Sequence, residues 1–310
     1  MGAEEGRHRT REGILALVFV QLLFGLFPLF VHLATHPHGG DDPSGGFSPR
    51  AIAFWRILVG AAVLAGVARA RHPGAFRISR AELPRLFACS FLGITANMTL
   101  ALEGTARTSV LNAGLLLTLI PVFTCGIAVV AGVEPFRARS AAGIVLSLGG
   151  AAWLMLLRQE TAHSRSDGIG NAMILANSLS YAAYLVLARN LLRRLPTLVV
   201  IAWVFLLAVP SAPFLAWGTE LLPSGAAPDA LFGIAYLVLF ATILAYLLNT
   251  FALARVGAST TAAFIYLQPL VAGASGVIVL GERPGAGALC AALCLLGGLG
   301  LVVRGARAAD

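Results

Sequence analysis

The chain contains no lysine, and charged residues make up only 12% of its 310 positions. All 22 basic residues are therefore arginines, a bias that is typical of a GC-rich bacterial genome. The formal net charge is +8, but the arginines are spread between apolar segments along the whole chain. We therefore predict no nucleic-acid partner, and the positive charge instead suits a role in membrane topology.

Catalytic and metal-binding groups are equally scarce at membrane depth. No aspartate falls within an apolar segment, and there is no His-Glu-x-x-His motif and no nucleophile–base pair there. The four cysteines lie inside apolar segments without Cys-x-x-Cys spacing, which favours a packing role. Residues 35–49 contain His36, His38, Asp41 and Asp42, but the flanking Gly, Pro and Ser more simply indicate a flexible loop. We expect no enzyme, no metal site and no cofactor.

Apolar sequence is abundant: 58% of the residues are hydrophobic, and they fall in blocks of about twenty, the length that crosses a bilayer as a helix. Lipid offers the backbone no hydrogen-bond partners, and the continuous apolarity of the blocks excludes an outer-membrane barrel. The first block outruns the core of a signal peptide and is predicted to remain as a helix. The ten predicted spans are residues 14–34, 51–70, 86–104, 108–132, 140–157, 168–188, 196–217, 230–251, 257–280 and 285–303.

The distribution of arginine predicts that both termini are cytoplasmic. If the N-terminus is inside, sixteen of the 22 arginines fall on inner segments and five on outer segments, while Arg56 lies within a span. Positive residues accumulate on the cytoplasmic side of membrane proteins. We therefore predict a multi-pass protein of a bacterial inner membrane, whose inner arginines contact anionic lipid.

An internal repeat predicts the architecture. Residues 106–150 recur without a gap 148 residues later, at 254–298, and ten of the 45 aligned positions are identical. Ten spans with this offset divide into two units of five, residues 1–157 and 158–310. Because five is odd, the two units must be inverted relative to each other in the membrane. Inverted repeats are typical of secondary transporters that alternate between outward-open and inward-open states, so we predict an all-α polytopic protein of this kind.

The matched prolines and glutamates have structural explanations beside functional ones. Pro121 and Pro269 lie within their spans, where a missing backbone hydrogen bond predicts a kink that serves either packing or a cavity-lining hinge. Glu134 and Glu282 follow at the ends of the same spans. A carboxylate at the start of the next helix favours capping of its free amides over proton transfer.

The duplicated motif resembles that of a known family. Leu119-Ile120-Pro121 followed by Glu134, and Tyr266-Leu267-Gln268-Pro269 followed by Leu280-Gly281-Glu282, are similar to the signature of EamA-type transporters of the drug/metabolite transporter superfamily. Phe54-Trp55-Arg56 also resembles that family, and the likeness covers about residues 14–303. It implies ten helices, a central cavity formed by both halves, and secondary transport of small metabolites, often export. Pro135 after Glu134, where the second copy has Arg283, departs from a strict repeat.

Polar side chains within spans are costly in lipid and usually face the interior of a bundle. Here they recur at helical spacing on the first, third, fourth, sixth, eighth and ninth spans, the set that the resemblance implies around a central cavity. An interhelical hydrogen bond explains any one of them better than substrate contact does. As a set, the predicted substrate-binding residues are Gln21, Asn97, Asn112, Asn177, Tyr181, Tyr246, Tyr266 and Gln268.

The expected substrate is a small neutral or zwitterionic solute, such as an amino acid, because amide and phenol groups outnumber charges within the spans. Arg56 keeps open a sugar-phosphate or nucleotide-sugar carrier, although an arginine that snorkels or pairs with carbonyls is favoured. Glu103, at the outer end of the third span, is the best candidate for proton coupling. A receptor or scaffold that transports nothing is the remaining alternative.

Overall fold

In the residues it describes, the computed structural model of the chain is helical apart from one hairpin of two two-residue strands, so the predicted fold class is confirmed. The hairpin pairs β1 (Glu160–Thr161) with β2 (Ser164–Arg165) in the connection between the two predicted repeats. The residues described are 2–38, 43–132, 138–156, 160–161, 164–165, 168–192, 194–256, 264–265, 267–281 and 283–307.

Ten helical segments follow one another in the described part of the chain, several of them in consecutive pieces. Those of the first repeat are α1 (Gly2–Gly25) with α2 (Phe27–Thr35), α3 (Pro49–Arg71), η1 (Arg80–Glu82) with α4 (Leu83–Ser90), η2 (Phe91–Thr95) and α5 (Ala96–Ala106), α6 (Val110–Leu117) with α7 (Leu119–Val130), and α8 (Ala138–Leu156). Those of the second are α9 (Gly168–Leu192), α10 (Thr197–Ala208) with η3 (Val209–Ser211) and α11 (Ala212–Ala216), α12 (Pro228–Ala235) with η4 (Tyr236–Leu244) and α13 (Ala245–Val256), α15 (Leu267–Leu280), and α16 (Ala286–Arg307).

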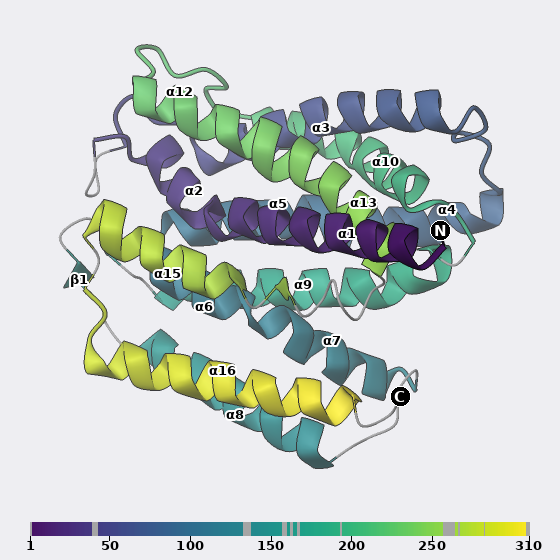
Figure 1. Ribbon diagram of the computed structural model, residues 1–310. Helices are drawn as coiled ribbons and strands as arrows, with labels where there is room; N and C mark the ends of the chain where they lie inside the picture. Colours follow the sequence, from purple (N-terminus) through teal and green to yellow (C-terminus); the bar gives the residue numbers. More distant parts are fainter. Residues whose placement is uncertain are drawn as a thin grey trace.

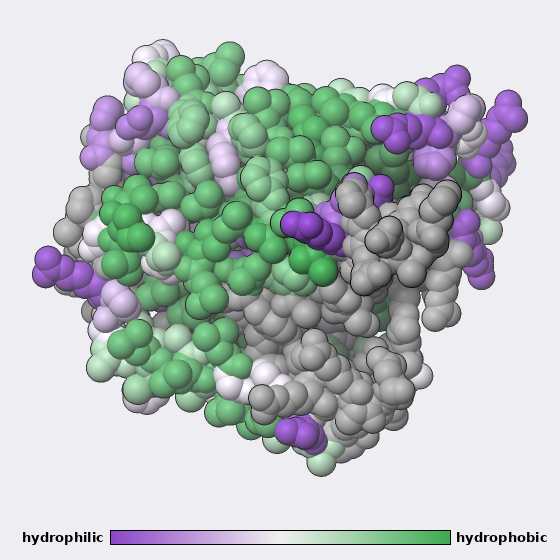
Figure 2. All heavy atoms as spheres, viewed as in Figure 1, coloured by the Kyte–Doolittle hydropathy of each residue, from purple (hydrophilic) through white to green (hydrophobic). Residues whose placement is uncertain are grey.

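The helices are apolar enough to form a membrane bundle. Within the described residues, seven segments reach the length and hydropathy of a membrane span, and shorter apolar helices cover 141–153, 270–280 and 286–298. The helices run roughly parallel, and the N- and C-terminal ends lie at the same end of the bundle (Figure 1). In the same view, apolar residues form a broad belt, while hydrophilic residues gather at the two ends of the helices (Figure 2). The belt is where lipid would lie.

Local sequence explains where several helices start and stop. The Ser48 hydroxyl accepts a hydrogen bond from the Ala51 amide at 3.2 Å, and Pro49 occupies the first turn of α3. Ser109 caps α6 in the same way. Gly132 and Gly281, with φ of +67° and +65°, follow the fourth helix of each repeat, where a left-handed residue ends a helix.

Both repeats interrupt helical regularity at matching places. The fourth span breaks at Thr118, between α6 and α7, three residues before Pro121. Pro269 is the third residue of α15, and the residues just before that helix lie mostly outside the described part of the chain. The third and eighth spans each contain a π-helical segment, η2 and η4, and the 148-residue offset places η2 within η4. Single π turns inside α-helices are frequent at functional sites.

The two repeats do not pack as separate bodies. The first helix of the first repeat, α1, packs on α13 and α15 of the second, and the first helix of the second repeat, α9, packs on α5, α6 and α7 of the first. Three further contacts pair equivalent helices: α3 with α10, α6 with α15, and α8 with α16. Exchanging the repeats leaves this pattern unchanged, as an inverted pseudo-two-fold requires.

The last helices of the repeats, α8 and α16, cross where each carries a glycine. They lie side by side at one edge of the bundle (Figure 1). A Cβ atom on Gly150 would lie 3.0 Å from the Ala291 carbonyl oxygen, and one on Gly298 would lie 2.5 Å from that of Gly143. The 148-residue offset maps each contact onto the other, so the pseudo-two-fold axis passes through this crossing. Small residues here let the two backbones approach closely.

Candidate functional site

Two pairs of predicted site residues meet across the repeats. The Gln268 side chain on α15 donates from Nε2 to Oε1 of Gln21 on α1, at 2.6 Å. On the other side of the bundle, Nδ2 of Asn177 on α9 donates to the backbone carbonyl of Asn97 on α5, at 2.7 Å. The Oδ1 atom of Asn177 is buried and accepts no hydrogen bond within the described part of the chain. In each pair, one residue lies on the first helix of its own repeat, α1 or α9, and its partner lies on the other repeat.

Aromatic residues fill the space near these amides. Tyr246 on α13 meets the rings of Phe24 and Phe205 edge-on, with centroids 6.3 and 5.3 Å away. Tyr181 and Tyr184 lie together on α9, 5.4 Å apart, and both are close enough to Tyr246 for electrostatic interaction. Tyr181 and Tyr246 remain only half-buried although their helices lie inside the bundle. All three phenols belong to the second repeat.

Glycine allows one of these rings to seat closely. A Cβ atom on Gly93, in η2, would lie 2.6 Å from the Tyr184 ring. The ring therefore rests directly against the backbone of the π-helical segment. Ser180 donates to the Leu92 carbonyl at 2.8 Å, which fixes α9 against the same turn.

Arg56 reaches from α3 into this region. Its Nε donates to the Thr242 hydroxyl in η4 at 2.8 Å, and the guanidinium carbon lies 4.9 Å from the centre of the Phe27 ring. The Thr242 hydroxyl in turn donates to the Leu237 carbonyl at 2.8 Å, five residues earlier in the π-helical segment. Tyr246 lies one turn further along and interacts electrostatically with Arg56.

The remaining predicted residues are less informative. Asn112 is buried in the first turn of α6. One turn further along the same helix, the Leu116 carbonyl accepts a hydrogen bond from Ser178 of α9. Tyr266, Glu134 and Glu282 lie outside the described residues, so the predicted capping role of the glutamates stays a prediction. The side-chain surroundings of Pro269 are likewise outside the description.

Glu103 lies apart from the central residues, at the end of α5. Its carboxylate is 3.7 Å from Nε of Arg50 and 3.7 Å from Nη2 of Arg107, and all three residues belong to the first repeat. The two arginine side chains are about half exposed, at 57% and 47%. The Glu103 carboxylate is thus held by two solvated cations near the end of α5.

Replacing Glu103 with glutamine should therefore have a small effect. Ion pairs this exposed contribute at most about 1 kcal/mol, so the free energy of unfolding is expected to fall by no more than that. Solute uptake driven by a proton gradient should persist in vesicles that contain Glu103→Gln. Loss of the proton-driven component alone, with solute exchange intact, would restore Glu103 as the coupling residue.

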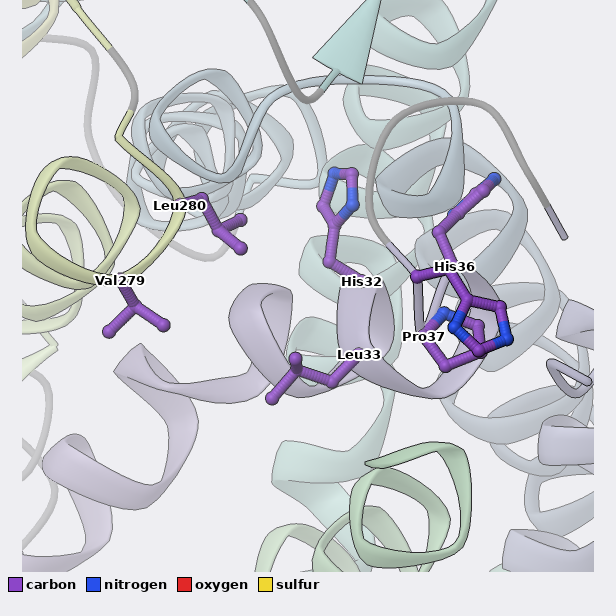
Figure 3. A pocket seen from close by; sticks show the side chains of 7 residues that line it. His32, Leu33, His36, Pro37, Val279 and Leu280 are labelled. Carbon is purple, nitrogen blue, oxygen red and sulfur yellow. The ribbon is translucent and has the colours of Figure 1, made fainter. Parts of the chain in front are cut away.

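A pocket of about 230 Å³ opens at the end of α2, away from the amide pairs. In Figure 3, His32 and Leu33 lie between Val279 and Leu280 of α15 and the His36–Pro37 turn. The buried His32 ring is tied by Nε2 to the Thr108 carbonyl at 3.2 Å. Asp41 and Asp42 lie outside the described residues, and within the described ones no group of His, Cys, Asp and Glu is placed to hold a metal. None of the predicted substrate residues lines this pocket.

Several residues of the central region escaped prediction. Thr242 was visible only as one polar residue at helical spacing with Tyr246, and Phe27, Phe205 and Gly60 carried no signal. A Cβ atom on Gly60 would lie 2.7 Å from the Phe205 ring and 3.2 Å from the Thr242 methyl group. Gly60 thus lets α3 approach η4 closely enough for Arg56 to reach Thr242. Only knowledge of which helices are neighbours could have revealed this.

The region as a whole offers amides, phenols and one guanidinium from both repeats. Such groups recognise polar atoms of a small solute, and the aromatic rings can contact its apolar part or its ammonium group. No aspartate or glutamate is buried in the described part of the chain. The chemistry available is therefore binding by hydrogen bonds and one positive charge.

Comparisons with known proteins agree with this architecture. The model of the EamA-like transporter family matches residues 11–156 and again 168–304. An uncharacterized transporter of Archaeoglobus fulgidus is 25% identical over 240 residues, which cover 76% of this chain and 81% of that protein. The uncharacterized transporter YdfC of Bacillus subtilis is 26% identical over 261 residues, 82% and 79% of the two chains. One protein crystal structure superposes with a TM-score of 0.63 over 97% of this chain and 99% of its own, at 17% identity, which supports the fold alone.

Proposed function

Since the chain belongs to the EamA-like transporter family and is a multi-pass membrane transporter, we propose that it exports a small neutral or zwitterionic, amino-acid-like metabolite by alternating access. The observation that supports the proposal is that polar side chains of the two repeats pair with each other within the apolar bundle, Gln21 with Gln268 and Asn177 with the Asn97 backbone. Polar groups are expensive at this depth and commonly mark a substrate pathway.

Alternating access is supported by the symmetry of the packing. Because α1 and α9 play equivalent parts in opposite repeats, each repeat can adopt the arrangement that the other gives up. The π-helical segments η2 and η4 occupy equivalent places beside the phenols. They are natural points at which the third and eighth spans could change shape.

The proposal is tested by solute flux in proteoliposomes with a panel of metabolites. Tyr246→Phe and Gln268→Leu are each expected to lower the flux of the transported solute at least tenfold, because each removes a hydrogen-bonding group from the proposed site. Asn97→Leu is expected to do the same. Solute flux measured in vesicles that hold the protein in one orientation, with and without an imposed proton gradient, would establish the direction of transport and its coupling to protons.

Two matched controls keep the test specific. Tyr236→Phe removes a phenol from the same span, one that donates to the Leu23 carbonyl at 2.9 Å. Ser275→Ala removes a hydroxyl that bonds only to Ala272 of its own helix α15. Both controls should retain flux. If the three site variants transported as well as the controls, the central site would be placed wrongly.

An anion carrier is the second candidate, and the burial of Arg56 is the observation that favours it. A sugar phosphate or nucleotide sugar carries two negative charges, whereas Arg56 is the one buried arginine among those whose burial is described. One buried cation suits one negative charge. The phosphate-type carrier is therefore the weaker of the two proposals.

A further inference from the structure

Arg56 is a buried charge without a counter-ion among the described residues. Only 5% of its surface is exposed, and no other Arg, Asp or Glu whose burial is described is buried. Within the described part of the chain, no carboxylate lies at ion-pair distance from it, and its hydrogen bonding is limited to Nε and the Thr242 hydroxyl. A neutral hydroxyl and a phenyl face do not balance the charge of a guanidinium. An uncompensated charge at this depth is strongly unfavourable.

The two terminal nitrogens of Arg56 have no hydrogen-bond acceptor in the described part of the chain. Neither, however, is among the fully enclosed side-chain atoms that lack a partner. The small exposed part of the side chain therefore includes these nitrogens. With Nε held by Thr242, the free edge of the guanidinium is the one that forms two parallel hydrogen bonds to a carboxylate.

The surroundings hold this free edge in place between the repeats. The close approach of α3 to η4 at Gly60 and the face of Phe27 fix the plane of the guanidinium. Tyr246, which interacts electrostatically with Arg56, contributes a phenol from the second repeat. A ligand at this edge would touch the first and the second repeat at once, as a transported solute must.

We infer that Arg56 binds a carboxylate of the transported solute, so that the substrate is a zwitterionic amino acid or another monocarboxylate rather than an uncharged metabolite. This inference rests on the proposed transport function and narrows its substrate class. The solute carboxylate supplies the counter-ion that Arg56 does not find among the described residues, whereas in the empty carrier the buried charge stays uncompensated. This difference favours reorientation with solute bound.

The test compares amino acids with their carboxamides, which differ at the carboxylate. Glycine, alanine, leucine and phenylalanine and the four corresponding amides are assayed for flux in proteoliposomes and for stabilisation of the purified protein against heat. Wild-type protein is expected to prefer the best acid over its amide by roughly 100-fold, the usual scale of a buried charge pair. In Arg56→Gln this ratio should fall close to one, and in Arg56→Lys it should be intermediate, because an ammonium group lacks the paired donors.

Arg50→Gln is the matched control, since it removes a half-exposed arginine from the same helix. It should keep the wild-type ratio. A ratio unchanged in Arg56→Gln, or a wild-type protein that treats acid and amide alike, would overturn the inference. So would stabilisation by inorganic phosphate or glycerol 3-phosphate but by none of the acids. If Arg56→Gln does not fold, the wild-type comparison and Arg56→Lys still decide.

The outcomes separate the inference from the transport proposal. Transport of uncharged solutes only would leave the proposed function intact and overturn the carboxylate site. Arg56-dependent stabilisation by acids without flux of any tested solute would support the site and contradict transport. Absence of both flux and stabilisation across the panel would overturn both.

Discussion

Replacing Gly298 with valine is expected to reduce the free energy of unfolding by about 3 kcal/mol or more, through collision with the facing helix. A Cβ atom there would lie 2.5 Å from the Gly143 carbonyl oxygen and 2.7 Å from the Ser147 amide nitrogen. These are backbone atoms of α8, which cannot turn aside as a side chain can. Relief requires α8 and α16 to separate along their contact, which is the largest between any two elements of the bundle.

Neighbouring glycines provide the matched controls. A Cβ atom on Gly297 would have Leu146 as its nearest contact, at 3.9 Å, and one on Gly149 would meet nothing within 4 Å. Gly297→Val and Gly149→Ala should therefore leave stability unchanged or slightly improved, since glycine is a poor helix former. Gly150→Val should resemble Gly298→Val because the two glycines make reciprocal contacts. Thermal unfolding of the purified variants measures the difference. Equal midpoints for Gly297→Val and Gly298→Val would show that the crossing is looser than described.

Residues 1–157 expressed alone are expected to yield no stable five-helix unit, and the same holds for residues 158–310. In the isolated first half, α1 loses its contacts with α13 and α15, and Gln21 loses its amide partner. In the isolated second half, α9 loses α5, α6 and α7. Unpaired polar groups facing lipid add to the loss of packing.

Co-expression of the two halves should restore the bundle, since the cut between residues 157 and 158 falls between α8, which is described to Leu156, and α9, which begins at Gly168. The measurement is recovery of a monodisperse species that resists protease, for each half alone and for the pair. A single half that is monomeric and unfolds cooperatively would contradict this expectation. It would also mean that packing of the first helix on the other repeat is dispensable for folding.

The sequence alone was sufficient to predict the helices but not which helices pack against one another. Apolar runs and helix-ending residues identified all ten segments, including the start of α9 at Gly168 and the break of the fourth span near Pro121. Both features depend on residues close together in the chain. The repeat, together with the odd number of spans, was enough to predict inversion.

The central region shows where such prediction stops. The helical spacing of the polar residues predicted which faces of α5 and α9 are polar, but not that Asn177 would donate to the Asn97 backbone. The Arg56–Thr242 contact joins residues 186 positions apart and depends on Gly60 and on a π-helical turn. Neither the glycine nor the π-helical turn produces a periodic pattern in the sequence. The packing of α1 on the second repeat and of α9 on the first likewise depends on how two helix surfaces fit each other. The composition of a single helix does not predict this fit.

The packing of α1 on helices of the second repeat also sets an order of events during synthesis. Gln21 and its partner Gln268 are 247 residues apart. At 5–20 residues per second, α1 therefore waits roughly 10 to 50 s in the membrane before α15 is made. During this interval the Gln21 amide has no native partner and needs a temporary one, such as water in the insertion channel or a lipid headgroup. The helix that enters the bilayer first is thus among the last to find its place.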